Sequence, residues 1–285
     1  MSPRPRTALG GAAAGVVLLF LTWFAAFHLG FFERLDHSVL IGFAGLHKPR
    51  VDGPAHFIAE LCNPEPYVFL VAVPVLVALI RGRPRVAVMV GGVVLGANLT
   101  SQLLKPLLAS SRNLGLGGPI LNPASWPSGH ATAVMTLVLC AVIVAPARWR
   151  PVVGALMSGF AIAVCYSFLT LAWHFPSDVL GGFEVAAVWV LLGVAALQWL
   201  EARNPARRPL AGDGRRPALS VAEALAPMAL LVLIALLAAA VVALARPVVV
   251  IDYASAHKAF IVGAAAIAGL GLALTAAATL ALRQN

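Results

Sequence analysis

The stretch Trp126-Pro127-Ser128-Gly129-His130, followed by the apolar run Ala131–Ala145, is the point from which the rest of the sequence is interpreted. The apolar run predicts a helix, and the preceding string places a hydroxyl, a bare backbone and an imidazole at its start. The unpaired N–H groups of a first helical turn favour an anion such as phosphate, and Gly129 leaves room for close approach. Serine before a helix is most often only an N-cap, so the string needs support from elsewhere in the chain.

The composition indicates a membrane protein. The chain has 285 residues, of which 61% are hydrophobic and 11% are charged, with a mean hydropathy of +0.92. A soluble domain carries about 25% charged residues. The net charge of +9 does not indicate a nucleic-acid partner, because the basic residues form short clusters between apolar runs. Cys62, Cys140 and Cys165 form no spaced pair, so we predict neither a disulfide framework nor a metal site.

We predict an all-α integral membrane protein with about eight spans of about 17–25 residues each. The first apolar run is longer than a signal-peptide core and has no small-residue cleavage site, so we expect it to be retained. The predicted helices are Ala8–Gly30, Pro66–Ile80, Val86–Leu104, His130–Ala147, Val152–Trp173, Val179–Leu200, Val221–Ala245 and Ala259–Leu282.

The distribution of Lys and Arg predicts the orientation. With a cytoplasmic N-terminus, 13 of the 20 basic residues fall in cytoplasmic segments and 7 on the opposite side, as the positive-inside rule requires. Because the number of spans is even, both termini are expected in the cytoplasm.

The chain divides into three parts. We expect a six-helix unit over residues 1–200, a basic cytoplasmic linker rich in Arg, Pro and Gly over 201–220, and a two-helix transmembrane addition over 221–285. Small residues in the addition, such as Gly263, Gly269 and Gly271, suit close helix packing against the core or in a homodimer. The mixed segment Phe31–Glu65 predicts interfacial helices over the outer mouth of the bundle.

The unusual polar groups of the six-helix unit gather on one side of the membrane. They are Lys105, Arg112, the Ser128-Gly129-His130 string, His174 and Asp178. Each has an ordinary explanation alone, such as a cation snorkelling to the headgroups or a histidine at a helix end. Those explanations do not account for a shared face, and ionisable groups facing a bundle interior are functional candidates.

The spacing of His174 and Asp178 indicates nucleophilic chemistry. A carboxylate at the start of a helix can accept a hydrogen bond from one imidazole nitrogen, which leaves the other nitrogen free to attack. Lys105, Arg112 and the amides after Ser128 would hold phosphoryl oxygens. His130, presented by a different helix, would protonate the departing oxygen.

Three motifs resemble the signature stretches of the type 2 phosphatidic acid phosphatase (PAP2) superfamily. They are Lys105-x6-Arg112, Pro127-Ser128-Gly129-His130, and Ser167-x6-His174-x3-Asp178, and a Leu35-Asp36 start common in bacterial members precedes them. The resemblance implies that His174 is the nucleophile, Asp178 its orienting group and His130 the general acid. It also implies that Lys105, Arg112, Ser128 and Gly129 bind phosphate, with Ser167 in an auxiliary place, and that no cofactor or metal is needed.

Two positions depart from the family pattern. Arg112 is followed by Asn113 where the family usually has Pro, and Ser167 is followed by Phe168 where the family has a phosphate-binding Arg. Loss of one charge-assisted contact weakens transition-state binding by about 1.5–3 kcal/mol. One hypothesis is therefore that Arg246 or Lys258, in the C-terminal addition, replaces the missing Arg.

The resemblance implies a bacterial cytoplasmic-membrane phosphatase acting on a lipid phosphate or polyprenyl (pyro)phosphate at the extracytoplasmic face. Two alternatives stay open at this stage. One is a phosphotransferase that moves the phosphoryl group from a polyprenyl donor to a lipid or glycan acceptor. The other is a non-catalytic lipid-binding or transport protein that retains the fold; Phe168 favours it, whereas the intact His130, His174 and Asp178 oppose it.

Overall fold

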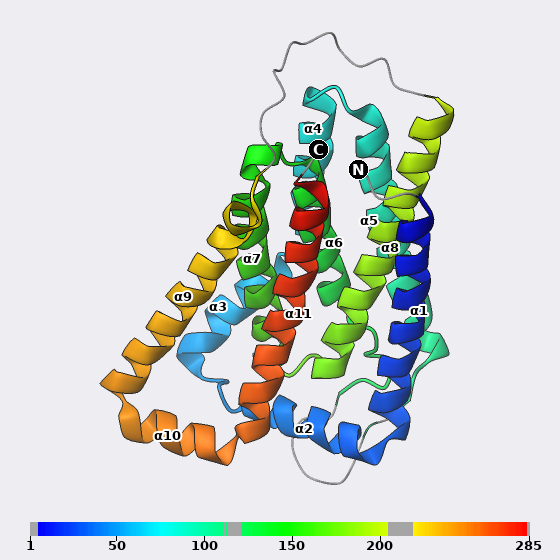
Figure 1. Ribbon diagram of the computed structural model, residues 1–285. Coiled ribbons are helices and arrows are strands. Elements are labelled where there is room, and N and C mark those ends of the chain that lie inside the picture. Colours follow the sequence, from blue (N-terminus) through cyan, green and yellow to red (C-terminus); the bar gives the residue numbers. More distant parts are fainter. Residues whose placement is uncertain (1–4, 111, 113–120, 205–218, 284–285) are drawn as a thin grey trace.

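The computed structural model describes residues 5–110, 112, 121–204 and 219–283, all of its regular structure being helical (Figure 1). The elements are α1 Pro5–His28, α2 Gly30–Ala44, α3 Pro49–Glu60, α4 Pro64–Ile80, α5 Pro84–Leu107, α6 Gly129–Val144, the 3-10 turn η1 Ala147–Trp149, α7 Arg150–Thr170, α8 Pro176–Arg203, α9 Val221–Ala245, α10 Pro247–Ala256 and α11 Lys258–Leu282.

Each of the eight predicted spans corresponds to one of these helices, which confirms the predicted fold class. Within the described residues, six helices are long and apolar enough to cross a membrane: α1, α5, α7, α8, α9 and α11. The count rises to seven if α3 and α4, which meet at a 57° bend, form one broken span. The remaining predicted span, α6, is apolar but has only 16 residues.

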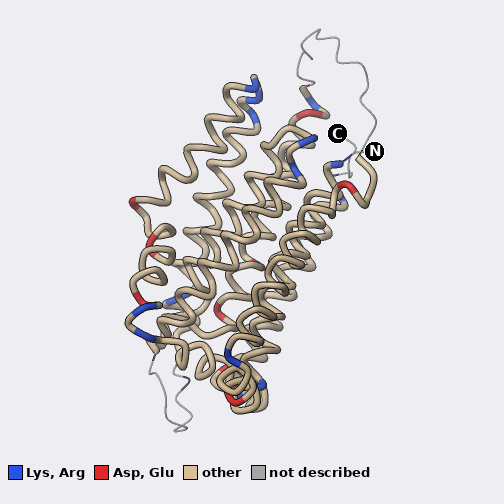
Figure 2. The backbone as a smooth tube through the Cα atoms, turned by 90° about the vertical axis from the view of Figure 1, so that its left-hand side faces the viewer, with Lys and Arg blue, Asp and Glu red and all other residues tan. Residues whose placement is uncertain are grey.

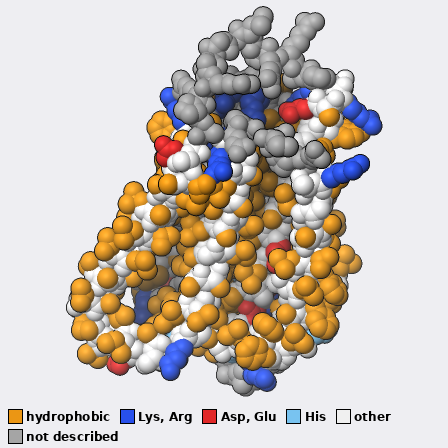
Figure 3. Space-filling view, viewed as in Figure 1, with side chains coloured by type: hydrophobic (Ala, Val, Ile, Leu, Met, Phe, Trp, Pro, Cys, Tyr) orange, Lys and Arg blue, Asp and Glu red, His pale blue; other side chains and the backbone are white. Residues whose placement is uncertain are grey.

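The charged groups lie mainly toward the two ends of the bundle. Figure 2 shows most Lys and Arg positions near these ends of the backbone, and Figure 3 shows hydrophobic side chains over most of the middle of one face. α1 and α5 begin, and α8 and α11 end, at the same end of the bundle (Figure 1). This distribution suits a protein whose apolar middle lies in a bilayer.

Helix α6 is the centre of the bundle. It packs against α4, α5, α7, α8 and α11, and 13 of its 16 residues are buried. A helix that is apolar on every side is stable only when neighbours cover every side. The helix after the Pro-Ser-Gly-His string is therefore the one around which the others pack.

Two glycines let the start of α8 approach the start of α6. A Cβ on Gly182 would lie 2.8 Å from the backbone oxygen of Ser128 and 2.9 Å from the backbone nitrogen of Thr132. A Cβ on Gly181 would lie 2.8 Å from the ring of Trp126, which is buried. Only glycine permits this approach without a shift of backbone, and the approach brings two of the three motifs together.

The predicted interfacial segment Phe31–Glu65 folds into α2 and α3. α2 lies across the end of the bundle opposite the start of α1 (Figure 1) and contacts α1, α7, α8 and α11. Of the two, α2 matches the expected interfacial position, whereas α3 continues through the bend into α4.

The C-terminal helices pack unequally on the core. α11 contacts α2, α6, α7 and α8 and buries Ile267, Gly271, Thr275 and Thr279. α9 contacts α7 but buries only Ala224 and Met228, and it diverges from the bundle toward α10 (Figure 1). Most of the linker predicted over 201–220 lies outside the described residues.

Candidate active site

The start of α6 is a capped helix N-terminus. The Oγ of Ser128 accepts a hydrogen bond from the backbone N–H of Ala131 at 3.3 Å, so this side chain is the N-cap of the helix. The backbone N–H of Ser128 donates to the backbone oxygen of Asp178 at 2.9 Å. The cap thus ties the second motif to the third, and its hydroxyl is already engaged within the protein.

Gly129 opens the turn toward two nitrogen donors. A Cβ placed on Gly129 would lie 3.0 Å from Nε2 of Gln102 and 3.5 Å from Nζ of Lys105. Both side chains come from the last turns of α5, one turn apart. A cation, an amide and a helix N-terminus therefore surround the space above Gly129, which is the donor set that a phosphoryl group requires.

His130 lies in the first turn of α6, next to Gly129. Its Nε2 lies 3.0 Å from Oδ1 of Asn63, the residue before α4. Because an amide oxygen only accepts hydrogen bonds, this contact assigns the proton to Nε2. The ring of His130 also lies 5.6 Å from the ring of Trp173 and 6.1 Å from the ring of His174, centre to centre.

His174 and Asp178 form a buried pair across the junction of α7 and α8. Nδ1 of His174 lies 3.2 Å from Oδ2 of Asp178, and the side chain of Asp178 is fully buried. The same carboxylate oxygen accepts the backbone N–H of Phe175 at 3.0 Å. These contacts orient the imidazole so that Nε2 is the nitrogen available for reaction.

The turn before His174 is set by a left-handed residue. Ala172 has φ of +53°, and the N–H groups of Ala172 and Trp173 donate to the carbonyls of Leu169 and Phe168. This is a Schellman ending of α7. It reverses the chain and delivers His174 to the start of α8.

Phe168 packs beneath both histidines. It has no exposed surface, and its ring centre lies 5.3 Å from that of His174 and 5.9 Å from that of His130. The position that carries Arg in the resembled motif therefore supports the imidazoles with an apolar ring here. Ser167, next to it, is buried in the last turns of α7.

Arg112 is engaged by protein groups. Its Nη1 donates to Asp36 at 3.0 Å and to Ser177 at 2.8 Å, and its Nη2 donates to Ser125 at 2.9 Å and to Asp178. The side chain is only 4% exposed. These four contacts hold the guanidinium against Asp178 and the residues around it.

Asp36 completes this buried network. Its two carboxylate oxygens accept the backbone N–H and the hydroxyl of Ser177 at 2.8 and 2.6 Å. Burial raises the pKa of Asp36 to about 6, although the guanidinium of Arg112 acts in the opposite direction. The first helix turn of α8 is thereby fixed to α2.

The structure does not bring Arg246 and Lys258 into this site. Both side chains are exposed, at the junctions of α9 with α10 and of α10 with α11. Neither of them contacts the histidines or Asp178 among the interactions of the described residues. The idea that one of them replaces the missing Arg has no support in this geometry.

Sequence reasoning missed Gln102, Asn63, Ser125 and Ser177. Gln102 lies three residues before Lys105 and so shares its helix face, a spacing that could have identified it. Asn63 carried no such signal, because its approach to His130 depends on the bend between α3 and α4. Within the described residues, no group of three or more His, Cys, Asp or Glu side chains is placed to hold a metal ion.

Comparisons with known proteins agree with this architecture. Residues 83–205 match the family model of the PAP2 superfamily. The crystal structure of a transmembrane PAP2 type phosphatidylglycerolphosphate phosphatase from Bacillus subtilis is similar, with a TM-score of 0.56 and 17% identity over 70% of this chain and 99% of that one. No curated protein sequence gives a significant match. The matched residues 83–205 contain all three motifs.

Proposed function

We propose that this chain, whose residues 83–205 match the PAP2 family model, is a membrane enzyme of that superfamily that hydrolyses a lipid phosphate or polyprenyl (pyro)phosphate through a phospho-histidine intermediate. One observation carries the proposal. The ring of His174, paired with the buried Asp178, lies 6.1 Å from the ring of His130, and the side chain of Lys105 lies beside Gly129, the residue before His130. A nucleophile, its orienting group, an anion cradle and a proton donor thus meet at one point.

In the first step, Nε2 of His174 attacks phosphorus. Asp178 accepts the Nδ1–H of His174, which keeps the lone pair on Nε2 and stabilises the positive charge that develops on the ring. An N–P bond forms and the P–O bond to the lipid breaks. The departing oxygen takes the Nε2 proton of His130, which starts this step as imidazolium and is left neutral, and Asn63 positions that proton beforehand.

The second step returns the enzyme to its starting state. Neutral His130 removes a proton from water, the water oxygen forms a bond to phosphorus, and the N–P bond to His174 breaks. The ring centres of the two histidines are 6.1 Å apart, so one phosphoryl group can contact both. His130 thus serves as acid in one step and base in the other.

Charge on the phosphoryl oxygens is offset by Lys105 and the start of α6. The amide of Gln102 adds a neutral donor on the same helix face. This cradle is the basis for proposing a metal-independent reaction. Arg112, by contrast, is proposed as a positioning residue that fixes Asp178 through the network with Asp36.

The proposed location is the extracytoplasmic side of a bacterial cytoplasmic membrane. The site lies toward the end of the bundle opposite the start of α1 (Figure 1), and the positive-inside count puts that start in the cytoplasm. A headgroup can meet water there while its hydrocarbon chains stay between helices. The phosphotransferase alternative shares the first step and differs only in the acceptor that attacks the phospho-histidine.

The experiment is phosphate release by the detergent-solubilised protein in the presence of EDTA. The substrates are phosphatidic acid, phosphatidylglycerol phosphate and a polyprenyl pyrophosphate, each compared between wild type and His174→Ala. Release that persists with EDTA and disappears in the variant supports the proposal and identifies the substrate class. No release from any of the three, but transfer to an added lipid or glycan acceptor, would favour the phosphotransferase. Binding of these lipids with neither release nor transfer would favour the non-catalytic protein.

A further inference from the structure

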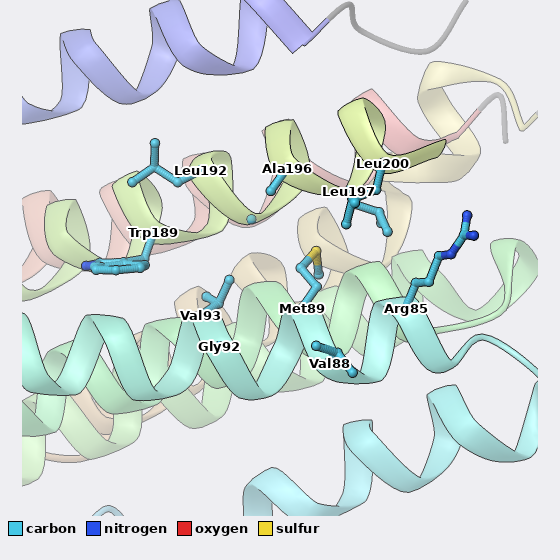
Figure 4. Close-up of a pocket in the computed structure, with 11 residues that line it drawn as sticks. Arg85, Val88, Met89, Gly92, Val93, Trp189, Leu192, Ala196, Leu197 and Leu200 are labelled. Atoms are coloured by element: carbon cyan, nitrogen blue, oxygen red, sulfur yellow. The ribbon is translucent and has the colours of Figure 1, made fainter. Parts of the chain in front are cut away.

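A cavity lies between α5 and α8, away from the active site. Its volume is about 360 Å³ and its walls are almost entirely apolar, including Val88, Met89, Val93 and Leu197 (Figure 4). Arg85 lines the cavity at the start of α5. Lys105, at the active site, lies in the last turn of the same helix. Those 20 residues span about 30 Å at 1.5 Å per residue, so the two sites are separate.

The cavity opens to the surface that a bilayer would cover. Gly92 lies in its wall, and a Cβ added there would meet no atom within 4 Å. Val88 and Leu192, which also line it, are exposed. Space of this kind beside lipid-facing side chains is accessible to a hydrocarbon chain without any movement of the helices.

One end of the cavity is basic. Arg85 extends from the start of α5 beside Leu197 and Leu200 (Figure 4), and its Nη1 donates to the backbone oxygen of Asn204 at 2.6 Å. This bond holds the guanidinium at the mouth of the cavity while the remaining N–H groups stay available, since arginine has five donors. A phosphate at this level would meet a fixed cation.

The other end is closed by Trp189. Its ring covers Gly96, where a Cβ would lie 2.4 Å from the ring, and its Nε1 donates to Thr100 at 3.0 Å. From Trp189 to Leu200 is 11 residues of helix, or about 16 Å. One leaflet of a bilayer contributes about 15 Å of hydrocarbon. The cavity is thus as deep as a single leaflet.

We propose that this cavity binds one anionic phospholipid of the leaflet on the side of Arg85, with an acyl chain along α5 and α8 and the phosphate against Arg85. Because the cavity is as deep as one leaflet, it fits an acyl chain that enters from that leaflet alone. The basic end selects an anionic headgroup over a zwitterionic one. This lipid is a bound component of the protein and is distinct from the substrate.

The test is native mass spectrometry of the full chain after equilibration with equal amounts of phosphatidylglycerol and phosphatidylcholine. Gly92→Phe fills the cavity, and Gly91→Phe is the matched control, because Gly91 is equally open but does not line the cavity. We expect wild type and Gly91→Phe to retain one phosphatidylglycerol, and Gly92→Phe to retain roughly tenfold less. Arg85→Gln should bind lipid but lose the preference for phosphatidylglycerol.

Three results would overturn the proposal. The first is retention of phosphatidylglycerol by Gly92→Phe at the wild-type level, as expected if the lipid occupied only the active site, whose Lys105 lies about 20 Å along α5 from Gly92. The second is an unchanged lipid preference in Arg85→Gln. The third is a dimer that Gly92→Phe dissociates, which would make a second copy of the chain the occupant. None of these depends on phosphate release, so the proposed function is tested separately.

Discussion

Arg112 and Asp178 form a buried ion pair that lies directly behind the candidate nucleophile. One oxygen of Asp178 accepts from Arg112 and the other from His174, and the side chains of Arg112 and Asp178 are 4% and 0% exposed. The sequence motif predicts that Arg112 binds phosphate, and from this contact we propose instead that it positions Asp178, the residue that orients the histidine.

This arrangement predicts a specific kinetic signature for Arg112→Lys. Lysine keeps the charge but cannot serve Asp36, Ser125, Ser177 and Asp178 at once, because it lacks the planar fork. We expect kcat to fall roughly ten- to hundredfold with KM changed less than about threefold. Steady-state kinetics on the substrate that the phosphate-release assay identifies checks this. A rise in KM at constant kcat would instead make Arg112 a substrate ligand.

Substitutions of Lys105 and Gly129 should affect KM, whereas the substitution of Arg112 should affect kcat. Lys105→Met removes the cation above the helix start, and Gly129→Ala adds a Cβ 3.0 Å from Nε2 of Gln102. Both changes are expected to raise KM, by about tenfold for the lysine. Gly269→Ala is the control, since a Cβ there meets nothing within 4 Å. Unchanged substrate affinity in both site variants would rule out the proposed cradle.

The buried carboxyl of Asp36 predicts a pH-dependent stability. Its pKa is raised from 3.8 to about 6, so the folded protein binds this proton more tightly than the unfolded chain. The resulting stabilisation is complete below pH 3.8 and is lost as the pH rises through 6. Between pH 4 and 6.5 wild type should therefore lose stability relative to Asp36→Asn, by on the order of 3 kcal/mol at most. Thermal unfolding in detergent measures this, and parallel curves for the two proteins would contradict it.

The left-handed Ala172 predicts a stabilising substitution. Glycine adopts φ near +53° without the steric cost that alanine carries there, so Ala172→Gly should raise stability by about 0.5–1 kcal/mol. The reverse change, Gly82→Ala at φ of +65° with no atom near the new Cβ, should lower it by a similar amount. Opposite shifts in unfolding temperature are expected. A destabilised Ala172→Gly would show that this turn is held by something other than backbone conformation.

The helices could be predicted because the physics that makes them is local. An apolar run of spanning length must pair its own backbone groups in a bilayer, and Val221–Ala245 was predicted with the bounds that α9 has. The bend between α3 and α4 could not be predicted, because it depends on how the two helices pack. The short span α6 was placed correctly by the motif that precedes it.

The sequence predicted which residues lie close together at the candidate site better than it predicted the contacts they make. Motif spacing indicated that His130, His174 and Asp178 would meet, and the close approach of α6 and α8 at Gly182 brings them together. The burial of Arg112 could not be predicted from the sequence. It depends on ion pairs with Asp36 and Asp178, which are far from Arg112 in the sequence. For the same reason the exposed positions of Arg246 and Lys258 emerge only from the fold.

The most direct test of the account is to trap the phosphorylated enzyme. The protein is mixed with a substrate labelled in its terminal phosphate, quenched in alkali, digested and mapped by mass spectrometry. The account predicts an alkali-stable, acid-labile phosphate on the peptide that contains His174, absent from His174→Ala and formed in the presence of EDTA. Continued phosphate release by His174→Ala, with no labelled histidine in wild type, would contradict it.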